Sequence, residues 1–82
     1  MKNKLALDLK DAADRYLAWN TKTFSDDAEM ISVGERDHDD LISIAGMIEN
    51  GEDSTRIARA MWKLDTAVRD IIPNDVYYAY NQ

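Results

Sequence analysis

Apolar residues recur at helical spacing in three stretches of this chain, and polar residues fill the opposite faces. The first stretch runs from Leu5 to Leu17 and predicts a helix. We expect this helix to end near Asn20, because the short polar and β-branched side chains of residues 20–23 disfavour its continuation. Tyr16 lies on the same apolar stripe and is expected in the core.

A second stripe follows Asp37 and includes Leu41 and Ile48. The pair Asn50-Gly51 predicts its end, since glycine adopts the left-handed conformation of a helix C-cap at little cost. Asp37 is therefore expected near the start of a helix, where the helix dipole favours negative charge.

A third stripe gives the strongest periodic signal and predicts one long helix over residues 54–72. Asp53 or Ser54 is expected to cap its start. Pro73 is expected to end it, because the residue before a proline rarely stays helical. The stripe consists of Ile57, Met61, Leu64, Val68 and either Ile71 or Ile72.

Two short segments have two interpretations each. Residues 26–32 form either a short helix capped by Ser25 or, over residues 30–33, an extended segment, and Gly34 would end either one. After Pro73, residues 74–80 form a short helix or, over residues 76–80, a strand.

The three stripes and their short connections predict an all-α fold, a small antiparallel three-helix bundle with a short C-terminal helix or extended tail. Residues 1–82 should form a single helical domain, because a chain of 82 residues supplies one core. The chain has no cysteine, which is typical of a reducing cytoplasm, and charged residues interrupt any signal-peptide core. No stretch approaches the roughly 18 apolar residues of a transmembrane helix, so no membrane partner is expected.

Negative charge is concentrated in one segment. Ten of the sixteen carboxylates fall within residues 25–53, together with a single cation, Arg36, so this segment carries −9 and the flanks carry +3. Such a concentration costs self-repulsion that folding does not require, and it predicts a face that binds a basic protein surface. The candidate partner-binding carboxylates are Asp26, Asp27, Glu29, Glu35, Asp37, Asp39, Asp40, Glu49, Glu52 and Asp53.

The C-terminal tyrosines add a second set of candidates. Tyr77, Tyr78 and Tyr80 lie too close together for one face to bury all three, so at least one should be exposed. Because tyrosine is favoured at interfaces, Tyr77 and Tyr78 are candidate partner contacts. Trp62 is adjacent to the third stripe and is expected at the margin of the core or at an interface.

Enzyme chemistry finds little support. With one histidine, no cysteine and no Gly-rich phosphate loop, we expect no catalytic site and no cofactor. His38 among acidic neighbours suggests either a divalent metal site or a solvated first turn of a helix, and the zinc and calcium ligand spacings are missing, so no metal site is assigned. Acidic residues interrupt the basic side of the third helix and the net charge is −6, so direct nucleic-acid binding is not expected.

Two resemblances bear on function. In size, acidity and lack of enzyme motifs the chain resembles small bacteriophage accessory proteins, including anti-CRISPR and other DNA-mimic inhibitors. This implies a cytoplasmic inhibitor, active in a bacterial host cell, that occupies the phosphate-binding groove of a nucleic-acid-binding complex. Residues 70–77 resemble the closing segment of the Hha family, whose helical proteins modulate nucleoid silencing. That implies a regulatory adaptor, monomeric or homodimeric, which binds a DNA-binding protein through apolar and tyrosine contacts.

Overall fold

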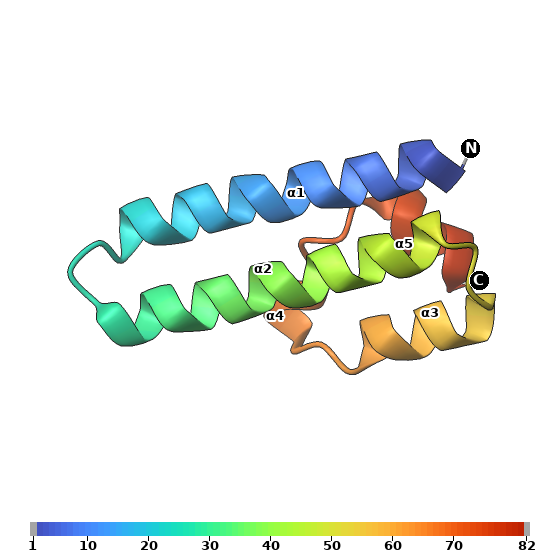
Figure 1. Ribbon diagram of the computed structural model, residues 1–82. Coiled ribbons are helices and arrows are strands. Elements are labelled where there is room, and N and C mark those ends of the chain that lie inside the picture. The colour runs from blue at the N-terminus through green and yellow to red at the C-terminus, as the bar shows by residue number, and fades with distance from the viewer. Residues whose placement is uncertain (1, 82) are drawn as a thin grey trace.

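The computed structural model describes residues 2–81, which form helices and no strand. The predicted all-α fold is confirmed. In Figure 1, α1 and α2 form a long antiparallel hairpin, and the later helices gather against the half of the hairpin away from the α1–α2 turn. The helices are α1 (Lys2–Thr23), α2 (Ala28–Glu49), α3 (Ser54–Trp62), α4 (Thr66–Arg69) and α5 (Asn74–Tyr80).

The apolar core occupies one half of the molecule. Residues 6–13 of α1 and 41–48 of α2 supply its hairpin side, and α3, α4 and α5 close it. None of the buried apolar residues comes from residues 16–36, the half of the hairpin next to the turn. The buried apolar side chains are Ala6, Leu9, Ala13, Leu41, Ile44, Ala45, Ile48, Ile57, Met61, Val68, Ile72 and Val76.

The prediction that Gly34 ends a helix is wrong, because α2 runs through it without interruption. Gly34 is buried against α1, where a Cβ atom would lie 2.5 Å from Cγ of Asn20. Asn20 is only 2% exposed, and its side-chain amide donates a hydrogen bond to the Met30 carbonyl at 3.0 Å. The glycine therefore permits close packing of two helices, and residues 30–33 are helical.

The bounds of both long helices differ from the predicted ones. Because the Asn20 side chain bonds to α2 and not to its own backbone, α1 continues to Thr23. The side chain of Asp27 caps the start of α2 by accepting a hydrogen bond from the Met30 backbone amide at 3.1 Å. Asp37 consequently lies in the middle of α2, not near the start of a helix.

The predicted end of α2 at Asn50-Gly51 is confirmed. Gly51 has a φ of 68°, and its amide donates to the Ile48 carbonyl at 3.1 Å. The Glu52 amide donates to the Met47 carbonyl at 3.1 Å, which completes a Schellman motif.

The prediction of one long third helix over residues 54–72 is wrong, because the helix breaks between α3 and α4 at residues 63–65 and α4 ends at Arg69, before Ile72. Asp65 and Thr66 favour starting a helix over continuing one, and Asp65 takes an extended conformation with ψ 150°. The break leaves Leu64 half-buried, while Val68 reaches the core. After Pro73 the chain is helical, so the strand over residues 76–80 is also wrong.

The two glycines of α2 give a matched test of the Asn20 contact. Gly34→Ala should lower the free energy of unfolding by about 1–3 kcal/mol, because the new methyl group overlaps a buried, hydrogen-bonded side chain. Gly46→Ala should raise it by about 0.5–1 kcal/mol, since an added Cβ there meets nothing within 4 Å and alanine favours the helix. Denaturant unfolding followed by circular dichroism measures both. Equal effects of the two substitutions would contradict this account of Gly34.

Candidate interaction surface

The ten candidate carboxylates all lie on α2 or the turns that flank it, but their environments differ. Eight are exposed, Glu52 is half-buried and Asp37 is buried. The exposed ones are Asp26, Asp27, Glu29, Glu35, Asp39, Asp40, Glu49 and Asp53.

Asp37 does not belong to the exposed acidic surface, which corrects the assignment made from the sequence. It is 6% exposed and accepts a hydrogen bond from the Tyr16 hydroxyl at 3.0 Å, and the Arg36 guanidinium lies 3.5 Å from its other oxygen. Burial raises the pKa of the Tyr16 hydroxyl, and the hydrogen bond to Asp37 adds to the effect. Tyr16 is half-buried, so it links α1 to α2 at the edge of the core and is not one of the core residues.

Three other candidates interact with a backbone amide, a lysine or an arginine inside the molecule. Asp27 caps α2, as described above. Glu49 pairs with Lys10 of α1 at 2.5 Å, and Glu52 pairs with Arg56 of α3 at 3.3 Å. Exposed pairs of this kind contribute little to stability, but they reduce the net charge at the end of α2.

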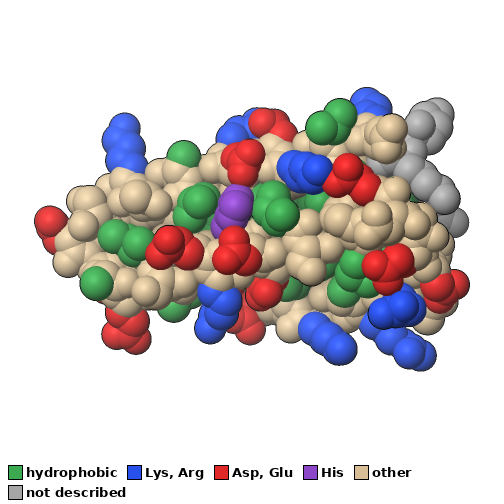
Figure 2. All heavy atoms as spheres, viewed as in Figure 1, with side chains coloured by type: hydrophobic (Ala, Val, Ile, Leu, Met, Phe, Trp, Pro, Cys, Tyr) green, Lys and Arg blue, Asp and Glu red, His purple; other side chains and the backbone are tan. Residues whose placement is uncertain are grey.

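The middle of α2 is different. Glu35 and Asp39 are one helical turn apart on the exposed side, and like charges at this spacing destabilise a helix by about 0.2–0.5 kcal/mol. Among the residues that the structure describes, no lysine or arginine lies within ion-pair distance of Glu35, Asp39 or Asp40. We refer to Glu35, Asp39 and Asp40 as the α2 carboxylate row. In Figure 2 acidic side chains are scattered over the visible face and are not fused into one patch.

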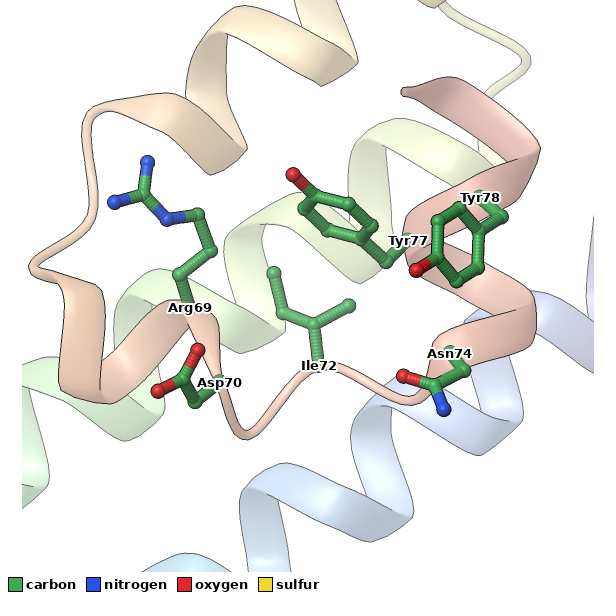
Figure 3. Close-up of a pocket in the computed structure, with 6 residues that line it drawn as sticks. All are labelled: Arg69, Asp70, Ile72, Asn74, Tyr77 and Tyr78. Atoms are coloured by element: carbon green, nitrogen blue, oxygen red, sulfur yellow. The ribbon is translucent and has the colours of Figure 1, made fainter. Parts of the chain in front are cut away.

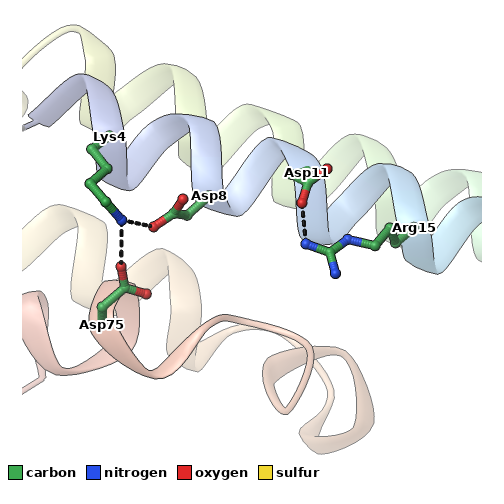
Figure 4. A network of polar contacts seen from close by, with 5 residues as sticks. All are labelled: Lys4, Asp8, Asp11, Arg15 and Asp75. Atoms are coloured by element: carbon green, nitrogen blue, oxygen red, sulfur yellow. Dashed lines mark hydrogen bonds and ion pairs between the residues drawn. The ribbon is translucent and has the colours of Figure 1, made fainter.

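The carboxylates of α1 provide a contrast, because nearby cations neutralise several of them (Figure 4). Lys4 lies 2.8 Å from Asp8 and 3.7 Å from Asp75 of α5, and Asp11 pairs with Arg15. The hydrogen bond between Lys4 and Asp8 raises the pKa of the lysine and lowers that of the carboxyl. Two of the three carboxylates of α1 are thus paired with a lysine or arginine, and the α2 carboxylate row is not.

His38 joins the two long helices. Its Nε2 atom lies 2.8 Å from an oxygen of Asp14 on α1, and its Nδ1 atom lies 3.3 Å from an oxygen of Asp39. The hydrogen bond to Asp14 is the main reason that the pKa of His38 is raised above 6.5, and Asp39 contributes less. The histidine lies in the middle of α2, so its interpretation as part of a first helical turn is wrong. No three His, Asp or Glu side chains within residues 2–81 converge as a metal-binding group.

The C-terminal tyrosines lie at the other end of the molecule. Tyr78 is 61% exposed, which confirms the prediction that at least one of the three tyrosines is exposed. Its ring meets that of half-buried Tyr77 edge-on, with 5.4 Å between the two ring centres. Both line a shallow pocket of about 290 Å³ opposite Arg69 (Figure 3). The Arg69 guanidinium lies 4.2 Å from the ring centre of Trp62, which is 58% exposed.

Sequence reasoning missed one group of aromatic side chains near the α1–α2 turn, of which Trp19 is exposed and Tyr16 and Phe24 are half-buried. Trp19 is 57% exposed, and its ring centre lies 6.3 Å from that of Tyr16 and 6.0 Å from that of Phe24. The available signal was the spacing of Trp19, which follows Tyr16 by three residues, so that the two side chains are neighbours on the helix surface.

Comparisons of the chain with protein-family models, curated proteins and solved structures find no match. Within residues 2–81, no helix combines the length and the apolar character needed to cross a membrane. The interpretation of function therefore depends on the exposed side chains and their chemistry.

The bridge between His38 and Asp14 predicts a pH-dependent stability. A raised folded-state pKa stabilises the protein fully below 6.5, the ordinary histidine value, and this stabilisation is lost as the pH rises through the folded-state pKa. Asp14→Asn should therefore lower the melting temperature more at mildly acidic pH than at alkaline pH. Thermal unfolding across this range measures the difference.

Asp11→Asn is the matched control, because Asp11 is an exposed α1 carboxylate that pairs with an arginine and not with a histidine. Its effect on the melting temperature should not vary with pH. Parallel pH profiles for the Asp11 and Asp14 variants would refute the role given to His38.

Proposed function

We propose that this protein is a small interaction module that binds a basic surface of a nucleic-acid-binding complex and inhibits or modulates that complex. The observation that carries the proposal is the α2 carboxylate row, whose exposed charges form no ion pair with a lysine or arginine of the described residues, unlike Asp8 and Asp11 of α1. A basic partner would supply the missing opposite charge.

The geometry of a helix suits imitation of nucleic acid. Glu35 and Asp39 are separated by about 6 Å along the α2 axis, from the rise of about 1.5 Å per residue. Two steps along one DNA strand span about 7 Å. A row of carboxylates at this separation can occupy positions on a basic groove that phosphates otherwise fill. In a bacterial cell, such a decoy would act as an anti-CRISPR or similar bacteriophage anti-defence protein.

The end of the molecule away from the α1–α2 turn supports a second candidate function. Tyr78 of α5 and Trp62, the last residue of α3, are large exposed side chains. Aromatic residues of this kind are enriched at interfaces. They favour a regulatory helical adaptor of the Hha type, which would bind a DNA-binding protein through apolar and tyrosine contacts. Such binding would depend little on salt, whereas binding through the carboxylate row would weaken steeply as salt rises.

Neutralising Glu35 and Asp39, two of the three charges of the carboxylate row, should sharply reduce partner capture and leave the fold intact. Glu35→Gln with Asp39→Asn removes a repulsive pair, so the free energy of unfolding should stay within about 0.5 kcal/mol of the parent value or rise. Affinity capture from a bacterial lysate with mass spectrometry measures the loss of nucleic-acid-binding proteins at low salt. Asp37 is left unchanged, because it is buried against Tyr16.

Asp65→Asn with Asp70→Asn provides the control. Both residues are exposed, and the double substitution changes the net charge by the same amount outside α2. This control should retain the captured proteins. Equal loss of the captured proteins in both variants would show that net charge alone causes the effect. Capture that persists in the Glu35 and Asp39 variant at low salt would rule out the carboxylate row as the binding site.

A further inference from the structure

The half of the α1–α2 hairpin next to the turn lacks a third layer. The segment after α3 lies beside the middle of α2, where Lys63 and Val68 line a shallow pocket together with Arg36 and Asp37. In Figure 1 the hairpin extends well beyond α3, α4 and α5 on the side of the turn. Apolar side chains in this region therefore have no helix of the described chain to cover them.

These apolar side chains are numerous and only partly buried. Trp19 is exposed, and the others are half-buried. We refer to them with Trp19 as the tip surface. The others are Tyr16, Leu17, Phe24, Met30, Ile31 and Val33.

The interior of this region is polar. The buried residues in 16–37 are Asn20, Gly34 and Asp37, which hold α1 and α2 together by hydrogen bonds and close packing. The tip surface thus adds little to the core of the hairpin. A large exposed aromatic residue beside partly buried apolar neighbours is the usual composition of a binding hot spot.

Three rings of the tip surface form a continuous row. Tyr16 stacks near Trp19, Trp19 meets Phe24 edge-on at 89°, and the Tyr16 hydroxyl bonds to Asp37 beside the α3–α4 connection. The row therefore continues from the place where the third layer ends. A helix docked on this row of rings would extend the third layer along the hairpin.

Charge determines the kind of partner. Residues 16–37 contain five carboxylates and two cations, a net charge of −3. A second copy of the chain docked tip to tip would bring these like charges together. A cationic helix with one apolar stripe would place apolar side chains on the aromatic row and cations beside Asp26, Asp27 and Glu29.

We propose that the tip surface is the docking site for a basic amphipathic helix of the partner, with Trp19 as its anchor. This inference deepens the proposed function, on which it rests: the α2 carboxylate row attracts a basic partner, and the tip surface holds it. The two contributions are separable, because one depends on charge and salt and the other on apolar contact.

A designed peptide tests the proposal directly. The probe is a peptide of about 18 residues, or five helical turns, with leucine on one helical face and lysine elsewhere. Two further peptides serve as controls, one with the same residues in an order that removes the stripe and one with glutamate in place of lysine. The readouts are the dissociation constant and the two indole N–H signals in a nitrogen–proton correlation spectrum.

The amphipathic lysine peptide should shift the Trp19 signal and leave that of Trp62 in place. Trp19→Ala should weaken binding at least tenfold. Trp62→Ala should change the dissociation constant less than twofold. It is a matched control, because Trp62 is 58% exposed and Trp19 is 57% exposed. Equal binding of the reordered peptide, or an unaltered dissociation constant for Trp19→Ala, would overturn the docking site.

Failure of each proposal has its own signature. If Glu35→Gln with Asp39→Asn abolishes binding while Trp19→Ala does not, the carboxylate row stands and the tip surface is refuted. If Trp19→Ala abolishes binding while Glu35→Gln with Asp39→Asn does not, the carboxylate row is refuted as the attracting element. Tight binding of the glutamate peptide would refute the basic character of the helix. Sedimentation that shows a dimer dependent on Trp19 would make a second copy the occupant and would refute the proposal.

Discussion

The close approach of α1 and α2 at Asn20 and Gly34 is the constraint on which the rest of the structure depends. A buried asparagine amide bridges the two helices by bonding to the Met30 carbonyl, and the facing position must lack a Cβ atom. Because Gly34 serves this contact, α2 continues through it for 22 residues. The carboxylates of the middle of α2 are therefore held on one continuous helix instead of on two helices with a turn between them.

The same contact explains why the molecule is asymmetric. Residues 6–13 and 41–48 meet α3, α4 and α5 in an apolar core, whereas the half near the turn is joined by Asn20, Gly34 and the bond from Tyr16 to Asp37. Polar contacts keep that half assembled without a covering layer. The molecule is elongated, 39 × 21 × 19 Å, with the apolar core at one end and uncovered apolar surface at the other.

The features that the sequence could predict are those set by nearby residues. The stripes containing Leu9, Leu41 and Ile57 and the Asn50-Gly51 end of α2 follow from local periodicity and local backbone preference. Gly34 and Asp37 could not be placed, because each takes its role from α1, through Asn20 and Tyr16. Most of the candidate carboxylates are exposed as expected, but their division into paired and unpaired groups depends on which cations the fold brings near.

The charge of the carboxylate row is coupled to the contact between the long helices through His38. Protonated His38 is a cation beside Asp39, and its raised pKa, due chiefly to Asp14 on α1, extends the protonated form toward neutral pH. Mild acid therefore tightens the link between α1 and α2 and at the same time neutralises part of the row. Protonation of His38 thus has opposite effects on two properties of the protein. It stabilises the α1–α2 hairpin, and it weakens the attraction of the carboxylate row for a basic partner.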